Sequence, residues 1–115
     1  VRFADFVGDS LQLGREASRQ RDARYIVFCA VSFMAEMARI LALPEQAVLY
    51  PESGARCPLA EMAQIDRVQA AWDGLKDLGH RLIPVVYVNS NADLKAFCGR
   101  NGGLVCTSAN ADRIC

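Results

Sequence analysis

Short apolar runs alternate along the chain with stretches in which apolar residues recur every three or four positions. The runs are typical of strands buried on both faces, and the spaced stretches are typical of amphipathic helices. We expect strands at residues 3–7, 25–30, 47–50, 82–88 and 104–107. We expect helices at residues 10–20, 33–43, 58–78 and 91–97, and a last helix that starts at Ser108.

The stretch at residues 58–78 carries the clearest helical pattern. Pro58 suits a first helical turn, and Gly79 suits the residue after the last turn. The apolar stripe of this helix consists of Met62, Ile65, Val68, Trp72 and Leu75. We interpret residues 58–79 as a helix that connects a first domain, residues 1–57, to the start of a second, residues 80–115.

The regular alternation of strands and helices predicts an α/β fold. Strands joined through helices pair in parallel, and their crossovers are right-handed. We therefore expect a three-layer αβα arrangement with a parallel sheet.

Composition and charge exclude several classes of function. Apolar residues make up 52% of the 115 residues, so a packed core is expected rather than disorder. Thirteen basic and thirteen acidic residues give no net charge to attract nucleic acid or an anionic membrane. No apolar stretch is long enough to span a bilayer, and the start does not resemble a signal peptide, so a cytoplasmic protein is expected. The lack of an initiating Met and the helix beginning at Ser108 favour an incomplete chain.

Polar residues follow the predicted strands. In open α/β sheets, ligands bind outside the carboxyl ends of the strands, where helix N-termini also favour anions. Asp, Asn and Ser are also ordinary helix caps, which is the commoner role for any one of them. Ser90 and Asp93 have the spacing of a capping box, which disfavours a substrate role for Ser90.

Cys57 differs from the other cysteines in its surroundings. The chain has five cysteines and a single histidine, and no two cysteines have the clustered spacing of a zinc site. Cys29 and Cys106 lie in apolar runs and are expected to be buried. Cys57 follows a glycine-containing loop and directly precedes Pro58 at a predicted helix start, which favours the thiolate. The local pattern leaves a structural and a functional role for Cys57 equally open.

Six blocks in this order and spacing resemble the quinolinate synthase family over almost the whole chain. The matching blocks are Ala4–Leu11, Ile26–Cys29, Phe33–Glu36, Ala55–Met62, Val85–Ser90 and Val105–Ala111. Each block alone is a weak signal, and the six together are specific.

The resemblance implies an enzyme of NAD biosynthesis. Members of this family condense iminoaspartate with dihydroxyacetone phosphate, and loss of phosphate and water with ring closure gives quinolinate. L-aspartate oxidase or aspartate dehydrogenase would supply the iminoaspartate. The family fold is three similar α/β domains, and a [4Fe–4S] cluster is held by three cysteines, one from each domain. Its fourth iron keeps an open position and acts as a Lewis acid.

The resemblance also implies roles for particular residues. Cys57 matches a cluster ligand. The matching substrate-binding positions are Asp9, Ser10, Tyr87, Asn89 and Ser108. Tyr87 is in addition the candidate for acid–base catalysis, because a phenol both donates and accepts hydrogen bonds.

The resemblance places the remaining parts of the site outside this sequence. The family's first histidine would precede Val1, and two further cluster cysteines with a later histidine and glutamate would follow Cys115. We therefore expect the 115 residues alone to lack a cluster and to be inactive. Two other functions stay open, a non-catalytic α/β binding module and an oxidoreductase domain with Cys57 as its redox thiol.

Overall fold

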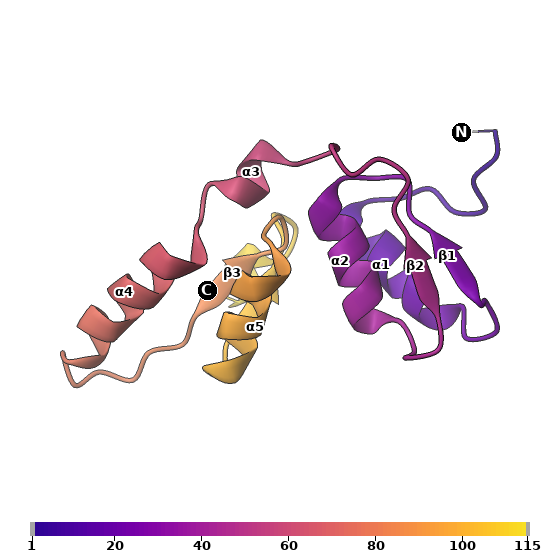
Figure 1. The fold of residues 1–115 in the computed structure, drawn as a ribbon. Coiled ribbons are helices and arrows are strands. Elements are labelled where there is room, and N and C mark those ends of the chain that lie inside the picture. Colours follow the sequence, from indigo (N-terminus) through magenta and orange to yellow (C-terminus); the bar gives the residue numbers. More distant parts are fainter. Residues whose placement is uncertain (1, 115) are drawn as a thin grey trace. The chain divides into compact units, whose positions relative to one another are not determined.

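The computed structural model describes residues 2–114, which divide into two compact units with the boundary between Cys57 and Pro58 (Figure 1). The first unit contains α1 (Ser10–Arg19), β1 (Tyr25–Val27), α2 (Ser32–Leu41) and β2 (Ala47–Leu49). The second contains α3 (Pro58–Glu61), α4 (Ile65–Lys76), β3 (Val85–Tyr87), α5 (Ala92–Arg100), β4 (Leu104–Cys106) and α6 (Ala111–Ile114). None of these helices has the length and apolar composition that crossing a bilayer requires.

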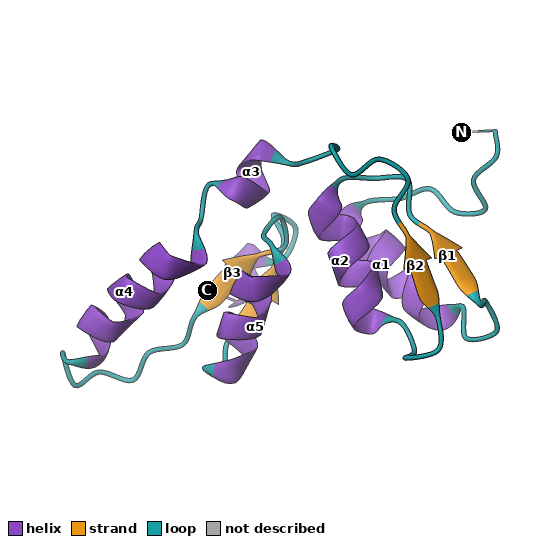
Figure 2. Ribbon diagram, in the orientation of Figure 1, coloured by secondary structure: helices purple, strands orange, loops and turns teal. Residues whose placement is uncertain are grey.

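In the first unit, β1 and β2 form a parallel pair, with α1 and α2 packed against it (Figure 2). The helices meet one face of the pair, where Ile26 and Val48 join a core that includes Phe28 and Ala38. The α/β class and the parallel pairing predicted from the sequence are confirmed. Within the described residues, helices cover this one face and not both faces as in the expected three-layer arrangement.

A buried glutamine fixes the end of the first unit at which both strands begin. The Gln46 side chain donates to the carbonyl oxygens of Gln20 and Ala23, each at 2.7 Å. Its Oε1 accepts the Leu43 backbone N–H at 2.9 Å, so the buried amide is paired at both ends. Because Gln20 is the C-cap of α1, that helix ends at this edge. Its first residue, Ser10, therefore lies toward the opposite edge, where the strands end.

In the second unit, β3 and β4 also pair in parallel, and α5 packs on them. The buried side of α5 consists of Leu94, Phe97 and Cys98. Cys98 Sγ lies 3.1 Å from the carbonyl oxygen of Pro84 and 3.2 Å from that of Leu104. Burial raises the pKa of the Cys98 thiol, so it stays protonated and fills space.

Helix α4 contacts α5 through an aromatic pair. The Trp72 and Phe97 rings meet edge to face, with centroids 5.5 Å apart. The single helix predicted at residues 58–78 is wrong, because the chain interrupts it between α3 and α4. Gln64 is extended there, with φ −101° and ψ 136°, and Met62 is 76% exposed rather than part of an apolar stripe.

The strands are shorter and more exposed than predicted. The described part of residues 3–7 contains no strand, and Phe3 is 91% exposed. Each strand has three residues, and in β1 Tyr25 and Val27 point away from the helices and are exposed. Burial on both faces was therefore a wrong expectation, because a two-stranded pair covered on one face leaves every second side chain open. The last helix begins at Ala111 rather than at Ser108.

Candidate functional site

Asp9 and Ser10 begin α1 at the edge of the first unit where the strands end. Asp9 is the N-cap, and its Oδ1 accepts the Gln12 backbone N–H at 2.8 Å. Ser10 is the first helical residue and is half-buried. The capping role considered for Asp9 is confirmed, and the residue is exposed.

A loop at residues 51–57, called here the Cys57 loop, follows β2 at the same edge. Its turn is held by Glu52, whose side chain accepts the Gly54 backbone N–H at 2.8 Å and whose carbonyl accepts that of Ala55 at 3.1 Å. The Ala55 carbonyl in turn accepts two hydrogen bonds, from the Ser32 backbone N–H at 2.9 Å and from the Tyr50 hydroxyl. Cys57 follows two residues later and is half-buried.

The described cysteines differ in exposure. Cys98 and Cys106 are buried, so burial was correctly expected for Cys106. Cys29 is exposed, so the burial predicted for it is wrong, because β1 ends at Val27 and Cys29 lies in the loop beyond. Cys115 lies outside the described residues.

Cys57 alone cannot hold a metal centre. Among residues 2–114, no three His, Cys, Asp or Glu side chains gather as a metal site. Helix α3 has four residues, so its dipole acts on Cys57 more weakly than the long helix expected from the sequence. A half-buried thiol in a fixed loop nevertheless has the donor chemistry of an iron–sulfur ligand. The first unit therefore fits the role of supplying one ligand.

Tyr87 and Asn89 leave β3 on the side that stays accessible. Residues along an extended segment alternate in direction. Val88 and Ser90 are accordingly buried, at 3% and 4% exposure, while Tyr87 is 38% exposed. Asn89 is half-buried, so both candidate side chains can reach a ligand beyond the end of the strand.

Ser108 reaches the same edge of the second unit from β4. The hydrogen bonding between β3 and β4 continues one residue past β3, where the Val88 backbone N–H donates to the Cys106 carbonyl at 2.8 Å. The Asn110 Oδ1 accepts the Thr107 backbone N–H at 2.6 Å and shapes the turn that follows. Ser108 is exposed in that turn. Because β3 and β4 are parallel neighbours, Ser108 lies at the edge where Asn89 lies.

Ser90 differs from its predicted role. The N-cap of α5 is Asn91 and not Ser90, so the expected capping box is wrong. The Ser90 Oγ is buried and has no hydrogen-bond partner among residues 2–114. Its carbonyl oxygen accepts the Lys95 ammonium group. The sequence pattern therefore predicted a capping hydroxyl, whereas the hydroxyl of Ser90 is buried and unpaired within the described part of the chain.

Replacing Ser90 with alanine is expected to stabilise the protein by about 1 kcal/mol, because a buried, unpaired hydroxyl carries an uncompensated desolvation penalty. Chemical denaturation would measure the change, with Ser108→Ala at the exposed turn as a neutral control. A clear loss of stability in Ser90→Ala would show that the hydroxyl is bonded, for example to an ordered water.

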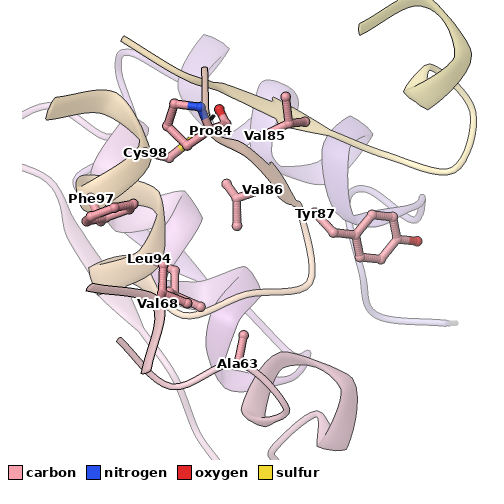
Figure 3. Close-up of a pocket in the computed structure, with 9 residues that line it drawn as sticks. All are labelled: Ala63, Val68, Pro84, Val85, Val86, Tyr87, Leu94, Phe97 and Cys98. Atoms are coloured by element: carbon pink, nitrogen blue, oxygen red, sulfur yellow. Dashed lines mark hydrogen bonds between the residues drawn. The ribbon is translucent and has the colours of Figure 1, made fainter. Parts of the chain in front are cut away.

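A cavity of about 260 Å³ lies in the second unit beside the candidate residues (Figure 3). Its walls are formed by Ala63, Val68, Pro84, Val85, Val86, Tyr87, Leu94, Phe97 and Cys98. The Tyr87 ring extends away from the space that the other side chains surround. These walls are apolar and suit no charged substrate.

Comparison with known proteins gives consistent matches along the whole chain. The sequence profile of the family described as "Quinolinate synthetase A protein" matches residues 1–115. The chain is 55% identical over 114 residues to a quinolinate synthase of Nocardioides sp., which covers 97% of this chain and 29% of that protein. It is 51% identical over 115 residues to the quinolinate synthases of Bacillus cytotoxicus and Bacillus cereus. Those matches cover 99% of this chain and 31% of each relative, so the chain spans less than a third of their length.

Proposed function

Because the chain belongs to the quinolinate synthase family, we propose that it forms part of a cytoplasmic transferase that makes quinolinate for NAD biosynthesis. The substrates would be iminoaspartate, supplied by L-aspartate oxidase or aspartate dehydrogenase, and dihydroxyacetone phosphate. One observation carries this proposal beyond the sequence match. In each unit, the candidate side chains lie at the edge where the parallel strands end, and they are at least partly accessible there.

Cys57 would hold one corner of a [4Fe–4S] cluster, and two cysteines outside this sequence would complete the set. When bound, the cluster supplies a Lewis acid that polarises oxygen atoms of the substrate. A thiolate suits iron as a soft donor, and the Cys57 loop is fixed at its base, so little ordering is needed for binding. The chain itself then contributes one ligand and a set of polar groups.

The polar groups have distinct tasks in this proposal. Ser10, at the start of α1, donates its hydroxyl to a substrate carboxylate, where the helix N-terminus favours negative charge. Asp9 already caps that helix and acts mainly by holding Ser10 in place. Asn89 and Ser108 orient the second substrate through amide and hydroxyl contacts at the end of β3 and β4. Tyr87 holds or delivers a proton through its accessible phenol.

The direct test is product formation by a polypeptide of the relatives' full length that contains this sequence. The enzyme would be reconstituted anaerobically with iron and sulfide, then given iminoaspartate and dihydroxyacetone phosphate. We expect quinolinate and inorganic phosphate in equal amounts. Absence of quinolinate, together with disulfide reduction that depends on Cys57, would favour the thiol oxidoreductase instead. Cluster-free protein that binds a ligand without turnover would favour the binding module.

Replacing Tyr87 by phenylalanine in the full-length enzyme is expected to lower kcat about a hundredfold, the typical contribution of one acid–base group. The ring and its packing remain, so cluster absorbance and thermal stability should match those of the wild type. Tyr25→Phe removes a phenol from the exposed side of β1 and is the control. Unchanged turnover in Tyr87→Phe would exclude a catalytic hydroxyl.

A further inference from the structure

The Ala55 carbonyl is the point at which the Cys57 loop joins the rest of the first unit. A carbonyl oxygen has two lone pairs, and here both have donors. One donor is the Ser32 backbone N–H, at the start of α2, and the other is the Tyr50 hydroxyl, directly after β2. These two bonds connect the loop both to the end of β2 and to the start of α2.

Hydrogen bonds within the loop shape its turn before Cys57. Residues 51–54 are exposed, and their described hydrogen bonds run from Gly54 and Ala55 back to Glu52 within the loop. An exposed loop of this kind opens at low free-energy cost unless its base is held. The two bonds at the Ala55 carbonyl, two residues before the thiol, therefore contribute to the conformation at Cys57.

We propose that Tyr50 is a positioning residue that fixes the Cys57 thiol for cluster binding, an inference that rests on the proposed function. The Tyr50 ring packs against the core of the first unit, which holds the phenol in place. The hydroxyl extends from this fixed ring to the Ala55 carbonyl. Tyr50 does not ligate the cluster; it restricts the loop so that the thiol is already placed when iron arrives.

Tyr50→Phe separates this role from packing, because it keeps the ring in the core and removes only the hydroxyl. Tyr25→Phe removes a phenol from the neighbouring strand, where the side chain is 57% exposed, and serves as the matched control. Cys29 is an exposed thiol in the same unit and provides an internal reference for reactivity.

The experiment measures two properties of the full-length enzyme. In the iron-free protein, the alkylation rate of Cys57 by iodoacetamide is taken relative to that of Cys29 by mass spectrometry. In the reconstituted protein, the rate of cluster loss to a chelator is followed by absorbance. We expect both rates to rise about fivefold in Tyr50→Phe, near the value of one net hydrogen bond, and to stay unchanged in Tyr25→Phe. Far-ultraviolet circular dichroism should show that both variants remain folded.

The outcomes separate this inference from the proposed function. If Cys57→Ser retains an intact cluster, the assignment of Cys57 as a ligand is wrong, and the positioning role of Tyr50 is then wrong as well. If Cys57→Ser loses the cluster while Tyr50→Phe matches the wild type in both rates, the positioning role alone is overturned. If Tyr50→Phe proves unfolded, hydrogen exchange of the peptide that covers the Cys57 loop is measured in the wild-type protein, where we expect protection. Wild-type rates in a folded Tyr50→Phe, or exchange of the wild-type loop as fast as in an unfolded peptide, would each contradict the proposal.

Discussion

Replacing Cys57 by serine in the full-length enzyme is expected to abolish the absorbance of the iron–sulfur cluster and to lower turnover about a thousandfold, because a Lewis-acid metal is worth several kcal/mol of transition-state stabilisation. A serine hydroxyl has nearly the shape of the thiol but is a poor ligand for iron–sulfur iron. The half-buried site tolerates the change sterically, so the melting temperature of the iron-free protein should stay the same. Iron and sulfide content, with anaerobic absorbance, measures the loss.

Cys29→Ser is the matched control for this prediction. Cys29 is an exposed thiol in the same unit, so its removal tests whether any accessible cysteine would give the same result. We expect full cluster content and full turnover in Cys29→Ser. An intact cubane in Cys57→Ser, or a comparable loss in Cys29→Ser, would contradict the assignment of Cys57 as the ligand.

Gly103→Ala is expected to destabilise the second unit by about 3 kcal/mol, at the upper end of the usual cost of overpacking. A Cβ at Gly103 would lie 2.1 Å from the carbonyl oxygen of Pro84 and 2.6 Å from Cys98 Sγ. The Pro84 oxygen also accepts the Leu104 backbone N–H at 3.0 Å. Moving this oxygen away from the new Cβ would break that bond, which joins the residue before β3 to the first residue of β4. Hydrogen exchange of the peptides that cover β3 and β4 would report the loss of protection.

Gly99→Ala, in the same glycine-rich stretch, is the control for this clash. Gly99 lies within α5, and a Cβ there would meet no atom within 4 Å. Alanine favours a helix over glycine by about 1 kcal/mol, so Gly99→Ala should be neutral or slightly more stable. Equal protection in Gly103→Ala and Gly99→Ala would show that the second unit adjusts around Gly103 without cost.

The alternation of strands and helices could be predicted because each element has its own apolar period. Periodicity located α2 and α5 to within a few residues of their observed ends. It did not reveal the break between α3 and α4, because Met62 continues the apolar spacing while its side chain is exposed. Periodicity identifies the positions of apolar residues, whereas their burial depends on tertiary packing.

The candidate site could be predicted only in part. The resemblance identified Cys57, Tyr87 and the other polar positions, and their exposure is a property of the fold that the sequence did not show. The capping box predicted at Ser90 is wrong because Asn91, one residue later, is the N-cap of α5. The hydrogen bond from Tyr50 to the Ala55 carbonyl could not be predicted from the neighbouring sequence. A tyrosine at the end of an apolar run resembles any other apolar residue, and the bond forms only when the loop folds back.

Three residues that bond to the Cys57 loop precede Cys57 in the chain. Ser32, Tyr50 and Glu52 are therefore synthesised before the thiol. Since domains fold largely as units, beginning with the N-terminal one during synthesis, the proposed ligand Cys57 can reach its final geometry on the ribosome. The cysteines that we propose as its partners would still be untranslated. Cluster assembly would then be a late step in maturation, in which iron joins a thiol already in place to the ligands that fold after it.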